Sequence, residues 1–164
     1  MEIGFDNPRL QQVLLNLLAN AVKFTPFSGQ VNIISSLVSK EEDLAVKDPL
    51  FTDILARANG KQFLEVQVQD TGVGIKQEDQ TKLFKLFGFL DTTQAINSRG
   101  IGLGLHISRK ICRMYDGDIV CRSEFGTGSN FVFIVALGDA SNLAHLEGPV
   151  QRIQNPLKKE YKKM

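Results

Sequence analysis

Two asparagines and a lysine occupy one stripe of the first expected helix, and their side chains suit metal and phosphate chemistry. Asn16, Asn20 and Lys23 recur at steps of four and three residues, which returns them to the same side of a helix. Asparagine is a poor helix former, so two on one face indicate a use other than helix formation. A carboxamide oxygen is a ligand that Mg²⁺ accepts, and an ammonium group places a point charge near phosphates. The alternative is a set of ordinary exposed polar positions, with Lys23 favoured by the helix dipole.

A carboxylate followed by two glycines marks the end of an expected strand. Asp70 precedes Gly72 and Gly74, and by itself this pattern is more typical of a turn. As a binding element, the Asp70 carboxylate would accept a hydrogen bond from the exocyclic amine of adenine, a contact that guanine would not reproduce. The two glycines would let the backbone approach the base closely, because they carry no Cβ.

A second glycine-rich stretch precedes another expected helix. Three glycines alternate with three branched apolar residues: Gly100, Ile101, Gly102, Leu103, Gly104 and Leu105. Backbone N–H groups at a helix N-terminus point toward phosphate oxygens, and the helix dipole assists. The spacing matches neither the dinucleotide-binding fingerprint nor the Walker loop. Arg99 either adds a charge-assisted hydrogen bond or is an ordinary surface arginine. Together, and in this order, the three stretches indicate a site for ATP with Mg²⁺.

The elements that position these residues follow from the hydrophobic pattern. Helices are expected over 7–24, 77–87 and 103–115, and strands over 30–38, 64–70, 118–123 and 129–137. The strand 64–70 alternates apolar and polar residues, which is typical of a half-buried strand. Residues 39–60 are too many for an ordinary hairpin connection, so we expect an exposed, mobile insertion there. The order of elements predicts an α/β fold of the α+β type, a two-layer sandwich with helices packed on one face of a mixed, largely antiparallel sheet.

Composition excludes several classes of protein. A chain of 164 residues with 43% hydrophobic and 23% charged residues is typical of one soluble globular domain. A net charge of +1 gives no reason to expect nucleic acid or an anionic membrane as the main partner. No apolar run approaches the roughly 18 residues of a membrane span, and no signal-peptide pattern is expected. Cys112 and Cys121 fit neither a metal site nor a disulfide framework, so we expect reduced packing residues in a cytoplasmic protein.

These stretches resemble the sequence boxes of the catalytic ATP-binding domain of sensor histidine kinases, in the GHKL group of gyrase, chaperone and mismatch-repair ATPases. The resemblance covers about residues 6–137, with an asparagine box at 14–25, glycine boxes at 70–75 and 100–105, a phenylalanine box at 83–87 and a hairpin pattern at 126–129. It implies that Asn20 binds Mg²⁺, that Asp70 binds adenine, and that residues 88–99, a polar stretch without periodicity, form a lid over the phosphates. It also adds four residues to the nucleotide site: Ile75, Phe84, Phe87 and Thr127.

One position separates two functions within this group. Hydrolysing relatives carry a glutamate one helical turn before the metal-binding asparagine, where it activates water. This chain has Asn16 there, which is no general base at neutral pH. The resemblance therefore implies a histidine kinase that presents the γ-phosphate to a histidine on a separate dimerisation domain, and indirectly serves a response-regulator receiver domain. His106 and His145 lack the sequence context of that phosphoacceptor, so we expect it outside this chain.

The resemblance also gives expected boundaries and leaves two alternatives open. Residues 1–138 would form the catalytic domain, and residues 139–164 a tail or linker stub. The family usually has one more strand before the residue that matches Asp6, so an edge strand is expected to be missing or supplied by another chain. One alternative is a degenerate nucleotide-sensing module that binds ATP without phosphotransfer. The other is an ATPase of the gyrase or chaperone kind, which Asn16 disfavours.

Overall fold

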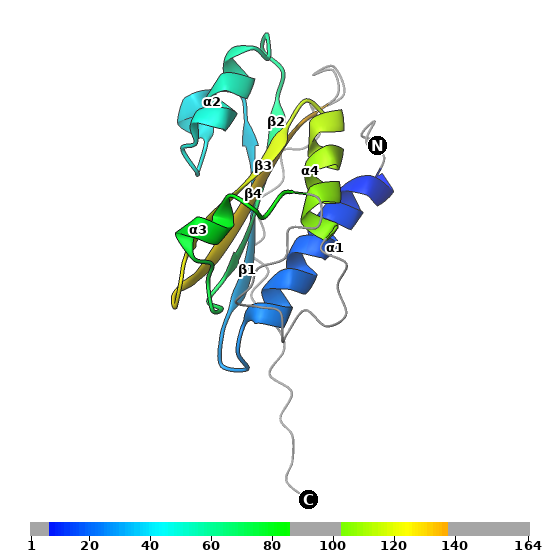
Figure 1. Cartoon of the computed structure of the whole chain (residues 1–164). Helices are drawn as coiled ribbons and strands as arrows, with labels where there is room; N and C mark the ends of the chain where they lie inside the picture. Colours follow the sequence, from blue (N-terminus) through cyan, green and yellow to red (C-terminus); the bar gives the residue numbers. More distant parts are fainter. Residues whose placement is uncertain (1–6, 86–102, 138–164) are drawn as a thin grey trace, which may run out of the picture.

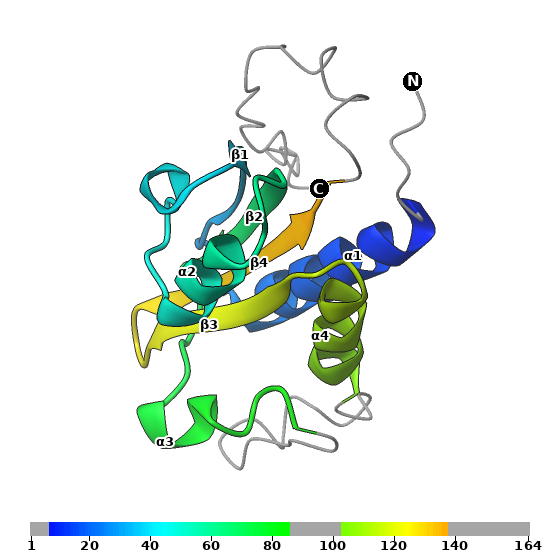
Figure 2. The same ribbon diagram turned by 90° about the horizontal axis from the view of Figure 1, so that it is seen from above.

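The computed structural model describes residues 7–85 and 103–137, which form a sheet with helices on both faces (Figure 1). The elements are α1 (Asn7–Phe24), β1 (Val31–Val38), the 3-10 helix η1 (Glu41–Asp43), α2 (Pro49–Ala56), β2 (Phe63–Asp70), α3 (Gln77–Gln80), α4 (Gly104–Met114), β3 (Asp118–Glu124) and β4 (Gly128–Ala136). The described strands pair antiparallel throughout, in the order β1-β2-β4-β3. This arrangement confirms the α+β class. In Figure 2, α1 and α4 lie on one side of the sheet and α2 on the other.

Helix α1 ends where the sequence predicts. The backbone N–H of Thr25 donates to the Ala21 carbonyl at 3.0 Å, and the Thr25 hydroxyl donates to the same oxygen at 2.6 Å. Pro26 follows, and proline disfavours helical geometry in the residue before it. The expected helix over 77–87 is shorter in the structure, because α3 spans Gln77–Gln80 and residues 81–85 form turns.

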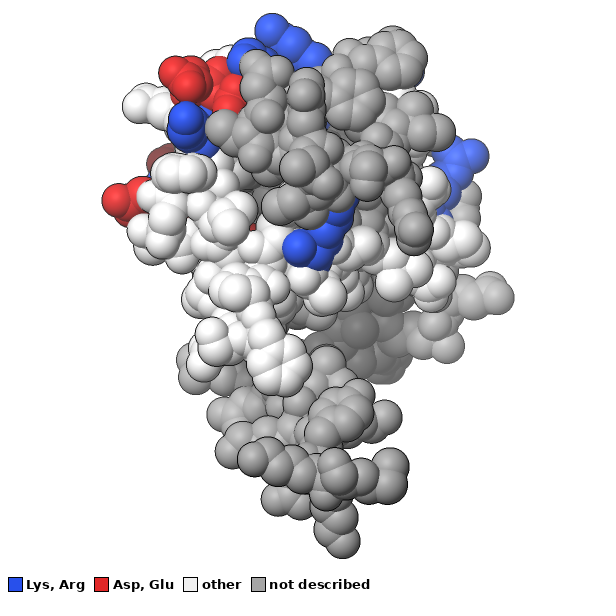
Figure 3. Space-filling view, turned by 60° about the horizontal axis from the view of Figure 1, so that its bottom comes forward, with Lys and Arg blue, Asp and Glu red and all other residues white. Residues whose placement is uncertain are grey.

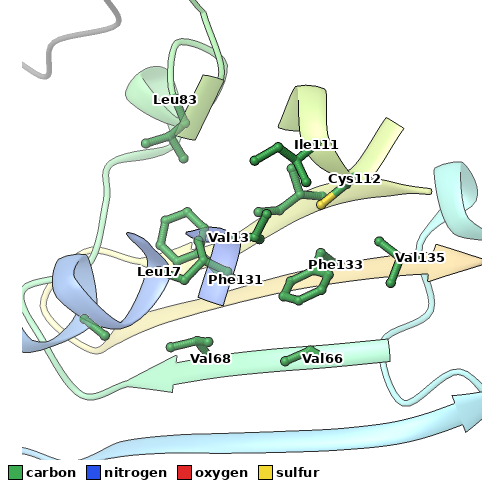
Figure 4. Packing of buried hydrophobic residues seen from close by; sticks show 12 residues of the cluster. Val13, Leu17, Val66, Val68, Leu83, Ile111, Cys112, Phe131, Phe133 and Val135 are labelled. Carbon is green, nitrogen blue, oxygen red and sulfur yellow. The ribbon is translucent and has the colours of Figure 1, made fainter. Parts of the chain in front are cut away.

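The main hydrophobic core lies between the sheet and the pair α1 and α4 (Figure 4). Its buried members come from both helices, from β2, β3 and β4 and, for Leu83, from the turns after α3: Val13, Leu17, Ala21, Val66, Val68, Leu83, Ile111, Cys112, Ile119, Phe131, Phe133 and Val135. Val13, Leu17 and Ala21 fall on one stripe of α1, as the spacing predicts. Both cysteines are free thiols; Cys112 is buried and Cys121 packs against this core. Burial raises the pKa of each thiol to about 12, so both are inert packing residues.

A buried carboxylate holds α4 against β3. Asp118 is 3% exposed and accepts from Arg109 Nε at 2.8 Å and Arg113 Nε at 3.0 Å. The backbone N–H of Ile119 donates to the same carboxylate at 2.7 Å. Because removing one partner would leave a buried charge uncompensated, this network holds the helix at a defined position on the strand. The position of α4 matters because the second glycine-rich stretch leads into it.

The segment 39–60 packs on the second face of the sheet: most of its residues are exposed, as expected, but several of its apolar residues are buried. Phe51 in α2 is fully buried and Leu44 is 3% exposed. These two residues belong to a second hydrophobic cluster with Val38, Val46, Phe63, Val132 and Ile134. Asp48 caps α2 by accepting from the Leu50 N–H at 3.0 Å, and Pro49 occupies the first turn. The burial could not be predicted because the apolar residues of α2 and of the segments that flank it show no long period.

Strand β2 is covered on both faces, where a half-buried strand was expected. Glu65 is fully buried and Gln67 is 3% exposed. Glu65 accepts from the Ala45 N–H at 3.0 Å and from Gln67 Nε2 at 3.0 Å. The segment 39–60 therefore covers polar side chains that the alternation pattern assigned to solvent. In the part of the chain that the structure describes, no helix is long and apolar enough to cross a membrane.

Candidate functional site

The asparagine stripe of α1 lies against the first turn of α4. Asn16 is half-buried, and its Nδ2 donates to the hydroxyl of Ser108 at 3.0 Å. A Cβ added to Gly104 would lie 2.1 Å from Asn16 Oδ1. The absence of a side chain at Gly104 therefore lets the Asn16 carboxamide sit directly on the N-terminal residue of α4.

Asn20 and Lys23 continue the stripe toward the end of α1. Asn20 is half-buried, and among the described residues none forms a hydrogen bond with its side chain. Its position four residues beyond Asn16 puts it about 6 Å further along the helix axis. Lys23 is exposed, with its Nζ 5.1 Å from the centre of the Phe24 ring. The stripe thus presents one tethered carboxamide, one available carboxamide and one ammonium group.

The turn after β2 packs against the C-terminal end of α1. Asp70 follows Val68 by two residues, so its side chain lies on the face of the sheet that α1 and α4 cover. Asp70 Oδ1 accepts from the Gly72 N–H at 2.8 Å, and the Val73 N–H donates to the Phe24 carbonyl at 3.2 Å. A Cβ on Gly72 would lie 2.5 Å from that carbonyl oxygen. The chain's own backbone therefore requires glycine here, whereas the expected close approach to a base stays a prediction.

The same turn is held from its other side by the hairpin between β3 and β4. Gly74 has a φ of 66°, and a Cβ there would lie 1.9 Å from the Glu124 carbonyl oxygen. The Gly126 N–H donates to the Val73 carbonyl at 2.8 Å, and the Ile75 N–H donates to the Ser123 hydroxyl at 2.8 Å. The hairpin that carries Thr127 is thus attached to the glycine turn that follows Asp70.

Partial burial governs the electrostatics of Asp70. Burial raises the pKa of this carboxyl above its usual value, while hydrogen bonds from the backbone of Gly72 and Ser129 oppose the shift. These two backbone donors do not use all the lone pairs of a carboxylate, which leaves acceptor capacity for a further donor. Asp70 can therefore accept a hydrogen bond from an amine that enters beside the turn.

The first residues of the phenylalanine box are clamped by α4. His106 Nδ1 lies 3.0 Å from the carbonyl oxygen of Phe84, and the Arg109 guanidinium lies 5.3 Å from the centre of the Phe84 ring. Phe84 and Leu105 are both half-buried and pack against the main core. His106 therefore has a structural partner, and the expectation that the phosphoacceptor lies elsewhere stays a prediction.

A cavity of about 470 Å³ opens at the end of β2 where Asp70 lies. Its lining includes Asp70 and Thr127 together with Gln69, Arg122 and Asn130. Alternation along the strands puts Gln69 and Asn130 on the face opposite α1 and α4. The cavity therefore touches one end of the candidate site, while the asparagine stripe lies on the other face of the sheet.

Figure 3 shows one face of the described surface. Acidic side chains and Lys or Arg side chains gather at its upper left, further Lys or Arg side chains lie near the centre and at the right, and the other described side chains in view are uncharged. Within residues 7–85 and 103–137, no group of three or more His, Cys, Asp or Glu side chains is positioned to hold a metal ion.

The described part of the chain thus contains most of the predicted site. Twelve predicted residues lie within it: Asn16, Asn20, Lys23, Asp70, Gly72, Gly74, Ile75, Phe84, Leu103, Gly104, Leu105 and Thr127. Phe87, Arg99, Gly100, Ile101 and Gly102 lie outside the described residues, as do the expected lid, His145 and the expected tail. Sequence reasoning missed Ser108 and Ser123, whose hydroxyls bond to site residues. A signal for Ser108 was its helical spacing from the apolar residues Leu105, Ile111 and Cys112.

Comparison with known proteins gives relatives that are histidine kinases. The family described as "Histidine kinase-, DNA gyrase B-, and HSP90-like ATPase" matches residues 5–139. The chain is 38% identical over 144 residues to the signal transduction histidine-protein kinase BarA of Escherichia coli (strain K12), covering 88% of this chain and 14% of BarA. It is 35% identical over 136 residues to hybrid signal transduction histidine kinase B of Dictyostelium discoideum, covering 83% of this chain and 6% of that protein. The chain thus spans a small part of these relatives.

Solved structures agree with the sequence relatives. Full-length ShkA in complex with AMPPNP has a TM-score of 0.58 and 27% identity, covering 80% of this chain and 22% of ShkA. The catalytic domain of histidine kinase ThkA has a TM-score of 0.55 and 28% identity, covering 80% of this chain and 69% of that domain. Because the family model matches most of this chain, the chain belongs to the histidine kinase-, DNA gyrase B- and HSP90-like ATPases, among the catalytic domains of histidine kinases.

Proposed function

We propose that this chain binds ATP with Mg²⁺ and presents the γ-phosphate to a histidine on a separate dimerisation domain of a two-component kinase. The observation that carries the proposal is the arrangement along α1. The middle of this helix contacts Gly104 through Asn16, and its end contacts the turn after Asp70 through Phe24. Helix α1 therefore lies between the Asp70 carboxylate, which suits the adenine base, and the N-terminus of α4, which suits phosphates.

The adenine end of the proposed site is the carboxylate of Asp70. The exocyclic amine of adenine donates hydrogen bonds, and the Asp70 carboxylate has acceptor capacity beyond its bond from Gly72. Guanine presents a carbonyl oxygen at the same place, which a carboxylate would repel. Asp70 would therefore select adenine, and the tight packing of the glycine turn would keep the carboxylate in a fixed direction.

The phosphate end is formed by the asparagine stripe and the start of α4. Backbone N–H groups at the start of α4 suit phosphate oxygens. Asn20 offers an oxygen without a partner in the described part of the chain, which fits the one or two protein ligands that Mg²⁺ commonly takes beside phosphates and waters. When bound, Mg²⁺ supplies neutralisation of the phosphate charge. Lys23, on the same stripe, adds a positive charge.

Transfer is favoured over hydrolysis because the site lacks a base where hydrolysing relatives have one. Asn16 holds that position, its amide is bound to Ser108, and a carboxamide does not take a proton from water. The remaining groups can orient ATP and stabilise its charge, which accounts for most of the catalysis in phosphoryl transfer. The complex of ShkA with AMPPNP supports ATP as the ligand.

The partners follow from the same proposal. The phosphoacceptor would be a histidine-bearing dimerisation domain of the full kinase, and a response-regulator receiver domain would take the phosphoryl group from it. An ATP-dependent domain fits the cytoplasm, including as the cytoplasmic part of a membrane-anchored kinase. A nucleotide-sensing module that binds ATP without transferring its phosphoryl group is the second candidate function. The close packing of the chain around Asp70 and Asn16 is compatible with both functions.

A transfer assay separates these candidates. The chain is mixed with radiolabelled ATP, Mg²⁺ and the dimerisation domain of the full kinase, and labelling of that domain is followed over time. We expect labelling that is lost in Asn20→Asp and in Asp70→Asn and retained in Asn59→Asp, a change at an exposed turn far from the site. Nucleotide binding without any labelling would favour the sensor, and intact labelling in both site variants would sink the proposed site.

A further inference from the structure

Ser108 lies under one of the site asparagines, at a place that none of the sequence boxes singles out. It is 1% exposed and belongs to α4, whereas Asn16 belongs to α1, 92 residues away along the chain. The bond between Asn16 Nδ2 and the Ser108 hydroxyl, at 3.0 Å, is a polar link between the two helices. A buried hydroxyl needs a hydrogen-bond partner, and here the partner is a residue of the candidate site.

The geometry also defines where the other end of the carboxamide lies. Gly104 precedes Ser108 by one helical turn on the same side of α4. A Cβ on Gly104 would lie 2.1 Å from Asn16 Oδ1 and 3.1 Å from Asn16 Nδ2. The carboxamide therefore lies between Gly104 and Ser108, which are one turn apart on α4. Its nitrogen lies at the Ser108 hydroxyl, and its oxygen lies nearest Gly104 at the helix N-terminus.

The two ends of a carboxamide differ in chemistry. The nitrogen only donates hydrogen bonds, whereas the oxygen accepts them and can face a cation. Without a partner for Nδ2, the group could rotate and present its nitrogen to a ligand. A rotated Asn16 would then repel a cation and its bound waters where an unrotated one attracts them.

We propose that Ser108 is a positioning residue that holds the Asn16 carboxamide against the N-terminal turn of α4, where its carbonyl oxygen lies toward Gly104. This inference rests on the proposed function, since it concerns the side of the site assigned to phosphates and Mg²⁺. Ser108 itself contacts no ligand and acts through Asn16. Loss of its hydroxyl should weaken the effect of Mg²⁺ on nucleotide affinity more than it weakens the fold.

The test uses two substitutions of nearly equal shape. Ser108→Thr keeps the hydroxyl and Ser108→Val replaces it with a methyl group. The dissociation constant of the chain for AMPPNP is measured by calorimetry with and without Mg²⁺. The ratio of the constant without Mg²⁺ to the constant with Mg²⁺ is then compared between each variant and the wild type. We expect Ser108→Val to reduce this ratio roughly three- to tenfold, the loss of one hydrogen bond, and Ser108→Thr to retain it. Equal ratios in the Val and Thr variants would overturn the inference.

Ser108→Ala provides a second route if the larger side chains do not fit the buried position. Its effect is measured alone and in the background of Asn16→Ala. If Ser108 acts through Asn16, the Ser108→Ala effect on the Mg²⁺ ratio disappears in that background, whereas a purely structural effect persists. Thermal unfolding of each variant reports the structural effect separately.

The outcome also distinguishes this inference from the proposed function. A wild-type chain that binds AMPPNP with Mg²⁺, loses the Mg²⁺ effect in Asn16→Ala and is unaffected by Ser108→Ala would overturn the role of Ser108 alone. A folded wild-type chain that binds no nucleotide would overturn both. The nitrogen and proton shifts of the Asn16 side-chain amide, measured by NMR without nucleotide, should change in Ser108→Val and stay near the wild-type values in Ser108→Thr.

Discussion

The two faces of the sheet are covered in different ways. On one face, α1 and α4 enclose an apolar core but leave Asn16, Asn20 and Asp70 half-buried beside it. On the other face, the segment 39–60 buries Phe51 completely and covers the carboxylate of Glu65. The first covering leaves polar groups at the edge of the core, and the second one seals them in.

The hydrogen bonds of the two faces explain what this difference means. Glu65 accepts from Ala45 and from Gln67, so its carboxylate is satisfied within the protein. Asn20 has no such partner in the described part of the chain. Buried polar groups that are satisfied internally contribute to the fold, whereas polar groups left with spare capacity can bind a ligand. On the second face, Ser36 Oγ and Asn130 Oδ1 are buried exceptions that nothing in the structure explains.

The largest expected effect concerns the second face alone. Phe51→Ala should lower the free energy of unfolding by about 3–5 kcal/mol, because it removes a fully buried aromatic ring and leaves a cavity. Denaturant unfolding measures this loss. Phe27→Ala is the matched control, since Phe27 is fully exposed and its removal should change little. A nucleotide affinity that falls with Phe51→Ala in fully folded protein would break the separation of the two faces.

The reverse pattern is expected at the first face. Asp70→Asn should weaken ADP binding by roughly 10- to 100-fold, the loss of a hydrogen bond to a charged acceptor. The free energy of unfolding should stay level or rise slightly, because the raised pKa of Asp70 shows that burial disfavours its charge. Calorimetry and denaturant unfolding on the same sample test both parts. Asp53→Asn, at an exposed position of α2, should leave both quantities unchanged.

Gly104→Ala should weaken nucleotide binding without lowering stability, and its effect on affinity should be smaller than that of Asp70→Asn. The new methyl group would meet Asn16 Oδ1 at 2.1 Å, and a side chain can move aside where backbone cannot. Alanine also favours a helix over glycine by about 1 kcal/mol, so the unfolding free energy should not fall. Displacement of Asn16 should weaken AMPPNP binding in Mg²⁺ by roughly two- to tenfold. A clear loss of stability with unchanged affinity would contradict the assignment of Gly104 to the site.

The smallest expected effect is a pH dependence with opposite signs for stability and affinity. The pKa of Asp70 is raised in the folded chain, so the folded state binds more protons than the unfolded state above the usual value of 3.8. The contribution of Asp70 to stability therefore falls as pH rises from that value through the raised pKa, and is level above it. Nucleotide affinity should rise over the same window, as the ionised carboxylate accepts from the amine. Both trends should be absent in Asp70→Asn, and their persistence there would assign them to another group.

Local signals in the sequence were sufficient for most of the first face. The spacing of Val13, Leu17 and Ala21 and the position of Pro26 define α1, and the alternation along 64–70 defines β2. These patterns depend on residues close together in the chain, which is why their bounds were predicted nearly correctly. The polar stripe of α1 was placed beside the core for the same reason.

Features that depend on distant residues could not be read in this way. The covering of the sheet by 39–60 depends on Phe51 meeting Val132 and Ile134 of β4, about 80 residues later. The bond between Asn16 and Ser108 depends on how α1 and α4 are aligned, which no local pattern encodes. The need for glycine at position 72 arises from the carbonyl of Phe24, although the sequence suggested a bound base as the reason.

Mapping a bound nucleotide by NMR tests the central claim most directly, that the first face of the sheet is the binding face. The ¹⁵N-labelled chain is titrated with ADP and Mg²⁺, and backbone and side-chain amide shifts are followed. We expect the largest changes at Asn16, Asn20, Gly72 and Gly104, and unchanged signals at Leu44 and Phe51. Changes concentrated around Gln69 and Asn130, on the opposite face, would place the ligand in the cavity there and contradict the account.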